Sequence, residues 1–262
     1  MQVRGFDVVR NGRPDPAIFV GRTLLNPGAA LASEMEVAAR LQSDGDAPAL
    51  AALIWSCRRC LVVSASDANR QRFAMASRVL GSKGWPVLVR QSGGSVVPQG
   101  PGMLNCTLVW LVPPAERPSI RQNFLKLCGL VTAALEGLQV ESSNGSLPGS
   151  FCDGRFNILL SGRKFGGTAQ RWITGSRNQR MAVIAHAVLL AEALETDAIE
   201  AVGLYRSVMG STEHFDPETC ISLKEHVADR SWIAFSGHSA KAALARALIE
   251  TLVGVEDGEL CR

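Results

Sequence analysis

The sequence has few lysines, no run of basic residues and no long apolar segment near its start. Its 262 residues carry a formal net charge of only +3, so the charge pattern gives no reason to expect a nucleic-acid-binding protein. Residues 1–22 mix charges, prolines and glycines, which is typical of neither a secretory signal nor a membrane anchor. We therefore expect a cytoplasmic protein that binds neither nucleic acid nor membrane.

The sequence also lacks the cysteine pattern of a disulfide-rich or zinc-binding protein. Its seven cysteines are odd in number and mostly lie in apolar stretches, which favours free thiols in a reducing compartment. Cys57 and Cys60 have the spacing of a zinc or redox pair, but no second Cys/His pair follows at ligand distance. The sequence therefore predicts no metal site.

Predicted strands and helices interleave along the chain without a repeat or a clear linker. The composition, 47% hydrophobic and 19% charged, suits a globular protein with a sizeable core. We expect an α+β fold in a single domain over residues 1–262. Residue spacing predicts helices at 29–41, 66–81, 119–138, 195–209 and 237–253, and strands at 61–63, 87–89, 104–112, 158–160, 163–171 and 181–190. The segment 50–60 fits a helix or a strand, and 142–146 has the composition of a loose loop.

A glycine-rich segment follows the strand predicted at 87–89. Gly93 and Gly94 would let the main chain approach a ligand closely and present amide donors, and Arg90 could bind an anion or a carbonyl group. A structural turn between two strands would need the same glycines. This segment alone therefore does not decide between a ligand site and a turn.

A second segment brings a thiol and an ammonium group into one short stretch. Cys152 lies between Gly149 and Gly154, and Lys164 begins a strand that contains Gly166 and Gly167. A cysteine can supply a nucleophile for acyl transfer, and a nearby lysine can lower its pKa and stabilise the oxyanion that forms. The alternatives are a packed free thiol and a solvated lysine.

The distance between these two residues sets a condition on the hypothesis. If Ser161 and Gly162 form a two-residue hairpin turn, Leu159 lies opposite Lys164. On a continuous strand, Cys152 would then lie roughly 20 Å or more from the lysine, at about 3.3 Å per residue. The segment 149–154 must therefore fold back over the sheet, which its two glycines permit.

Several ordered motifs resemble those of the biotin and lipoate protein ligase family. The resemblance covers roughly residues 85–190, and it implies a single catalytic domain with a mixed, mostly antiparallel sheet flanked by helices. It also implies an acyl chain in a tunnel beside the glycine-rich segment. The motifs are Arg90-x-Ser92-Gly93-Gly94, Gly102-x-Leu104-Asn105, Gly162-Arg163-Lys164-x-x-Gly167-x-Ala169-Gln170 and the later His186.

Within that family, the segment from Gly149 to Arg171 resembles octanoyltransferases that use a cysteine. The resemblance implies that Cys152 carries an acyl thioester and that Lys164 is essential. It implies transfer of an octanoyl or lipoyl group to a lysine of a lipoyl domain, from the glycine-cleavage carrier protein or an acyl carrier protein. It further implies substrate contacts at Arg90, Ser92, Gly93, Gly94, Val96, Asn157, Gly166, Gly167, Thr168 and His186.

Departures from the ligase pattern favour the ATP-independent transferase. Gln99 and Gly100 replace a His-Asp pair, and Phe156-Asn157 replaces Asn-Asp, so a carboxylate suited to a metal-bound nucleotide is missing. We therefore expect no cofactor. An ATP-dependent lipoate-protein ligase using ATP and Mg, and a non-catalytic carrier- or ligand-binding relative, are the alternatives. His186, between alanines, fits a ligand contact or a hydrogen-bonded core histidine.

Overall fold

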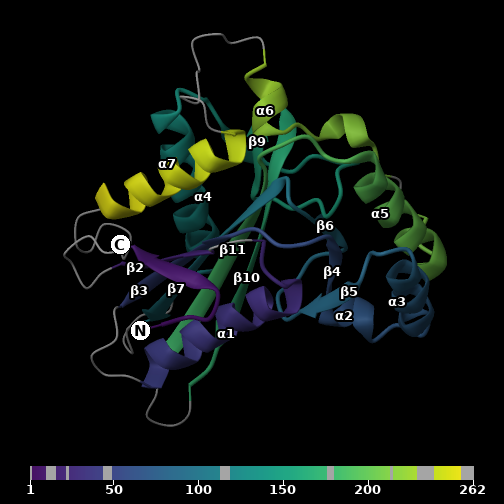
Figure 1. Ribbon diagram of the computed structural model, residues 1–262, viewed down its shortest axis with the longest axis horizontal. Coiled ribbons are helices and arrows are strands. Elements are labelled where there is room, and N and C mark those ends of the chain that lie inside the picture. Colours follow the sequence, from purple (N-terminus) through teal and green to yellow (C-terminus); the bar gives the residue numbers. More distant parts are fainter. Residues whose placement is uncertain are drawn as a thin grey trace.

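The computed structural model describes residues 2–9, 16–21, 24–43, 49–112, 119–175, 180–212, 215–228 and 239–254 (Figure 1). Its main feature is an eight-stranded sheet in the order β1-β2-β3-β7-β11-β10-β9-β8. Only the β2–β3 pair among its neighbours is parallel. The strands are β1 Phe6–Val9, β2 Ala17–Gly21, β3 Leu50–Trp55, β7 Met103–Val112, β8 Ser143–Gly145, β9 Asn157–Leu160, β10 Arg163–Ile173 and β11 Met181–Leu190.

A smaller sheet of three strands carries the glycine-rich segment. Its order is β5-β4-β6, with β4 parallel to β5 and antiparallel to β6. The segment 91–96 connects β5 to β6, a strand that was not predicted, since the next strand expected after the glycine-rich segment was at 104–112. The strands are β4 Cys60–Ser64, β5 Val87–Arg90 and β6 Val97–Gln99.

Helices cover both faces of the large sheet, which confirms the α+β class and the mostly antiparallel sheet with flanking helices. Alternate residues of each strand point to opposite faces, so Leu53 and Trp55 pack with α1, whereas Ala52 and Ile54 face the cluster that contains α4 and α7. Figure 1 shows α4 and α7 together, and α3 and α5 together beside the small sheet. The helices are α1 Pro27–Ser43, α2 Ala65–Ala68, α3 Phe73–Ser82, α4 Ile120–Gly137, α5 Thr196–Met209, α6 Leu223–His226 and α7 Ala240–Gly254, with a 3-10 turn at Pro217–Thr219.

Two of the predicted elements differ from the structure. The single helix expected at 66–81 is two helices, because the Ser64 hydroxyl caps α2 through Asp67 N and that helix ends at Ala68. The expected loop at 142–146 contains β8, which pairs with β9 at the sheet edge. Residues 237–238 of the last predicted helix lie outside the described residues. No helix in the described ranges is long and apolar enough to cross a membrane.

Candidate active site

A tight hairpin and a bulge place Lys164 at the site. Ser161 and Gly162 have φ of 47° and 74°, as a two-residue turn with two left-handed positions requires, and Leu159 pairs with Lys164 as predicted. The register then shifts between Lys164 and Gly166. In a regular strand, Lys164 and Gly167 are three residues apart and would point to opposite faces of the sheet. The bulge between Lys164 and Gly166 adds one residue, so that Lys164 points to the same face as Gly167.

The loop that contains Cys152 folds back onto this lysine, which confirms the predicted return of the chain. The Lys164 ammonium donates hydrogen bonds to the main-chain oxygens of Phe151 at 2.6 Å and Cys152 at 2.8 Å. It also lies 4.9 Å from the centre of the Phe151 ring. The lysine is fully buried, and burial lowers its pKa. Lys164 therefore holds the loop through its backbone.

The Asp153 carboxylate fixes the start and end of the same loop. It accepts hydrogen bonds from Ser146 Oγ, Leu147 N and Asn157 Nδ2, each at 2.7 Å. Burial alone would raise the pKa of Asp153, but these hydrogen bonds outweigh it and the pKa is lowered. Asn157, expected at the substrate, is therefore buried as a loop-fixing residue.

The Cys152 sulfur faces the glycine-rich segment. It lies 3.2 Å from the amide nitrogen of Ser95, which donates to it, and 4.0 Å from a terminal nitrogen of Arg90. Cys152 has φ of 49°, a left-handed conformation that costs a non-glycine residue about 1–3 kcal/mol. Among the cysteines that the structure describes, it is the only one that is not buried. Cys152 is therefore partly exposed, and its sulfur contacts a hydrogen-bond donor and a cation.

Arg90 holds the glycine-rich segment in place. Its guanidinium donates to the carbonyls of Val62, Gly93 and Ser95 at distances of 2.8–3.1 Å. Burial lowers the pKa of Arg90, and Cys152 opposes this shift, yet a guanidinium stays charged in proteins. The charge that contacts the sulfur is thus that of Arg90, whereas the Lys164 ammonium contacts carbonyl oxygens.

Gly94 leaves the space that the sulfur and the guanidinium fill. A Cβ at this position would lie 2.6 Å from an Arg90 nitrogen and 2.8 Å from Cys152 Sγ, and its φ is +103°. We expect Gly94→Ala to destabilise the protein by about 1–3 kcal/mol and to change the alkylation rate of Cys152 by iodoacetamide. Gly93→Ala is the matched control, because nothing lies within 4 Å of a Cβ there. Equal alkylation rates and stabilities in the two variants would contradict this packing.

A cavity of about 40 Å³ opens beside the thiol. Trp55, Val97, Cys152, Lys164 and Val188 are among its lining residues, and the buried indole N–H of Trp55 has no hydrogen-bond partner among the described residues. At about 10–15 Å³ per water, the cavity has room for only a few waters. An acyl chain would need the walls to move apart.

The candidate substrate-binding residues separate into two groups. Arg90, Gly167, Thr168 and His186 line the cavity, and Ser92 hydrogen-bonds to His186 at 3.0 Å. Val96 does not face it, because this residue packs in the cluster of α3 and α5 and Val97 lines the cavity instead. Gly166 has a packing role, since a Cβ there would lie 2.7 Å from Leu189 Cδ2.

The sequence analysis missed Glu34 and Asp153. Glu34 lines the cavity and is held by Thr107 Oγ1 at 2.6 Å and by His186 Nδ1 at 3.3 Å. A signal was present in the sequence, because Glu34 lies on the same helical face as Ala30, Val37 and Leu41, where a carboxylate needs a buried partner.

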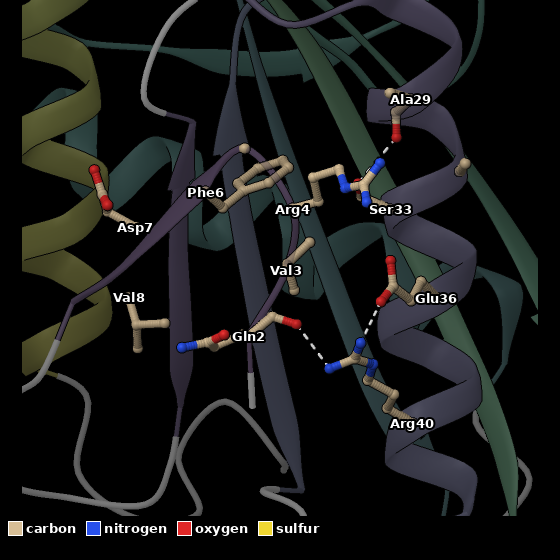
Figure 2. Close-up of a pocket in the computed structure, with 12 residues that line it drawn as sticks. Gln2, Val3, Arg4, Phe6, Asp7, Val8, Ala29, Ser33, Glu36 and Arg40 are labelled. Carbon is tan, nitrogen blue, oxygen red and sulfur yellow. Dashed lines mark hydrogen bonds and ion pairs between the residues drawn. The ribbon is translucent and has the colours of Figure 1, made fainter.

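A larger groove of about 1050 Å³ lies between the N-terminal segment and α1. Figure 2 shows Arg40 reaching the Gln2 carbonyl and the Glu36 carboxylate there. The groove shares no lining residue with the cavity at Cys152, and no cysteine, lysine or histidine is among the described residues that line it. The candidate nucleophile Cys152 therefore lies at the smaller cavity and not in this groove.

The Cys57 and Cys60 pair is buried. A hydrogen bond that the Cys60 thiol donates to Cys57, together with burial, raises the pKa of the Cys60 thiol. Within the described ranges, no group of three or more His, Cys, Asp and Glu residues could hold a metal ion.

A family model and several known proteins match this chain in sequence. Residues 26–229 match the model of the lipoyl protein ligase A/B catalytic domain. An octanoyl-[GcvH]:protein N-octanoyltransferase of Kyrpidia tusciae is 38% identical over 141 residues, 52% of this chain and 48% of that protein, so the chain spans about half the length of this relative. An uncharacterized protein of Cupriavidus necator is 34% identical over 186 residues, 66% of this chain and 73% of that one.

A solved structure extends the similarity to the fold. Protein Ta0514 of T. acidophilum, solved with bound lipoic acid, superimposes with a TM-score of 0.51 at 16% identity. The superposition covers 89% of this chain and 94% of that one. The family model and this fold agree with the motifs at Arg90 and Lys164, and the chain belongs to the lipoyl protein ligase A/B family.

Proposed function

We propose that this protein moves an octanoyl or lipoyl group from a carrier protein to a lysine of a lipoyl domain through a thioester on Cys152. The observation that supports this most directly is the partly exposed thiol at the cavity, with the Ser95 amide and Arg90 beside its sulfur. The thiolate is the reactive form of cysteine, and an N–H donor and a cation both favour it. The coarser assignment, lipoyl-related transfer, rests on the family and on the octanoyltransferase relatives.

In the first half-reaction, the Cys152 thiolate attacks the acyl carbonyl carbon. A C–S bond forms and the bond to the donor breaks; an amide donor's nitrogen leaves with a proton, whereas a thioester donor's sulfur leaves as a thiolate. The negative charge on the carbonyl oxygen develops close to the sulfur, so the Ser95 amide and Arg90 are the donors best placed to stabilise it. We propose that Lys164 supports the reaction by holding the loop that carries the nucleophile, since its ammonium donates to the Phe151 and Cys152 carbonyls.

In the second half-reaction, a lysine amine of the lipoyl domain attacks the thioester and Cys152 leaves as a thiolate. We propose the glycine-cleavage carrier protein as donor, since the named relatives act on octanoyl-[GcvH]. We also propose that neither ATP nor a metal takes part. At the position of the ligases' His-Asp pair, the Gln99 amide and the Asn105 amide form a reciprocal pair of hydrogen bonds. Neither Gln99 nor Gly100 has a carboxylate that could bind a metal ion.

The proposal is tested by incubating the protein with octanoyl-carrier and digesting it for mass spectrometry. The expected result is an octanoyl adduct on the peptide that contains Cys152, which disappears when a lipoyl domain is added. An acyl carrier protein as donor is a parallel arm. ATP-dependent pyrophosphate exchange without an adduct would support the ligase instead, and binding of the carrier without turnover would support a non-catalytic relative.

A further inference from the structure

A chain of hydrogen bonds joins three polar side chains that come from distant parts of the sequence. Ser92 Oγ lies 3.0 Å from His186 Nε2, and His186 Nδ1 lies 3.3 Å from Glu34 Oε2. The other oxygen of Glu34 accepts from Thr107 Oγ1 at 2.6 Å. The carboxylate and both hydroxyls are buried, and the His186 side chain is 13% exposed.

These contacts set the tautomer of the imidazole. A carboxylate only accepts hydrogen bonds, so the proton of neutral His186 lies on Nδ1, facing Glu34. The lone pair of Nε2 then accepts the proton of the Ser92 hydroxyl. An imidazole with this orientation can take a proton at Nε2 while the buried carboxylate stabilises the resulting cation.

His186 lies in the wall between two cavities. One is the cavity at Cys152, and the other, of about 250 Å³, is lined by Gln91, Ser92, Arg171 and His186 among others. Glu34, Arg90, Leu31 and His186 line both. Because His186 lines both cavities, it is placed to contact a group in the second cavity as well as one held at Cys152.

We propose that His186 is the general base for the acceptor amine, with Glu34 as its positioning residue. This inference rests on the proposed function. The incoming lysine amine displaces the Ser92 hydroxyl from Nε2 and attacks the thioester carbon, so that a C–N bond forms and the C–S bond breaks. Nε2 takes the proton that the nitrogen loses, Cys152 leaves as a thiolate, and the imidazolium returns the proton to solvent.

When the acyl donor is an amide, a proton moves in the opposite direction, from His186 to the leaving nitrogen. A donor lysine that leaves during acylation of Cys152 must gain a proton, and by microscopic reversibility the His186 imidazolium supplies it. A thioester donor needs no such proton, because its sulfur leaves readily as a thiolate. Proton transfer by His186 is therefore required for amines, as a base when the amine attacks and as an acid when it leaves, and for thioester donors in neither role.

The test separates these steps with small probes. Wild type, His186→Gln and Glu34→Gln are each loaded with S-octanoyl-N-acetylcysteamine, and the Cys152 adduct is followed by mass spectrometry. The acyl-enzyme is then mixed with a lipoyl domain or with hydroxylamine, whose nitrogen, once bonded to the acyl carbon, is acidic enough to lose its proton to water without a base. We expect normal loading and normal hydroxylamine cleavage in both variants, with transfer to the lipoyl domain slowed about a hundredfold or more.

Glu34→Gln is the sharper variant because it keeps the imidazole. Thr107 Oγ1 would still donate, now to the amide oxygen of Gln, so the amide nitrogen would face Nδ1 and donate to it. The His186 proton would move to Nε2, which could no longer accept one. His226→Gln is the control, since His226 lines neither cavity and should leave all rates unchanged.

The outcomes separate this inference from the proposed function. Failure of wild type to form any Cys152 adduct, with either probe or carrier, would overturn the proposed function and this inference with it. A normal adduct in wild type with normal lysine transfer in His186→Gln would overturn only the inference. Loss of thioester loading in both variants would also overturn the inference, because His186 and Glu34 would then act on the Cys152 thiol and not on the acceptor amine.

Discussion

Replacing Cys152 by alanine is expected to lower the rate of octanoyl transfer by about a thousandfold or more, the scale seen when an enzyme loses its nucleophile. The acyl group then has no covalent carrier between donor and acceptor. The fold should be retained, since the Lys164 and Asp153 contacts that hold this loop do not use the sulfur. Transfer is measured by mass spectrometry of a lipoyl domain under single-turnover conditions, alongside thermal unfolding.

Cys106→Ala is the matched control for this result. Burial raises the pKa of the Cys106 thiol to about 12, so it supplies no thiolate near neutral pH. This variant should keep its transfer rate. Full activity of Cys152→Ala or Cys152→Ser would exclude the covalent route.

Replacing Lys164 by methionine is expected to reduce transfer by about a hundredfold and the free energy of unfolding by about 1–3 kcal/mol. The carbonyls of Phe151 and Cys152 would lose their buried donor, and the loop would no longer be held. Lys224→Met is the control, because the Lys224 side chain is 66% exposed in a surface ion pair. Urea denaturation and single-turnover transfer measure the two effects. An unchanged transfer rate in a folded Lys164→Met protein would show that the lysine is not needed to hold the loop.

The pH dependence of this stability difference has a defined sign. Burial lowers the folded-state pKa of Lys164 below its ordinary value of 10.5, so between these two pKa values the unfolded chain binds more protons. The unfolding free energy of wild type should therefore rise relative to Lys164→Met as the pH rises through that window. Urea titrations at several pH values measure it, and a falling difference would contradict the assigned shift.

Local pattern predicted much of the sheet and part of the site. The turn at Ser161 and Gly162 follows from two residues that tolerate left-handed conformations, and it fixed the pairing of Leu159 with Lys164. The return of the Cys152 loop was correctly required by distance. The bulge before Gly166 was not predicted, because the extra residue changes the face of the sheet without changing the composition of the strand.

Contacts between distant segments were beyond the sequence patterns. Glu34, Ser92 and His186 come together only through the packing of α1 on β7 and β11, which no local spacing specifies. Val96 was expected to shape an acyl tunnel, whereas Val97 lines the cavity at Cys152 and Val96 packs with α3 and α5. Which residues of a short strand point toward a cavity depends on where the preceding loop ends. Here the loop ends at Val96, and Val97 lines the cavity.

Lys164 fixes the backbone of the Cys152 loop without contacting the reacting side chain through its hydrogen bonds. Its two hydrogen bonds end on peptide oxygens, which every amino acid possesses, so the grip does not distinguish one side chain from another at position 152. A selenol, a hydroxyl or a methyl group at position 152 should therefore leave both Lys164 hydrogen bonds in place. The reacting atom at position 152 can thus be changed while the backbone position that carries it is kept.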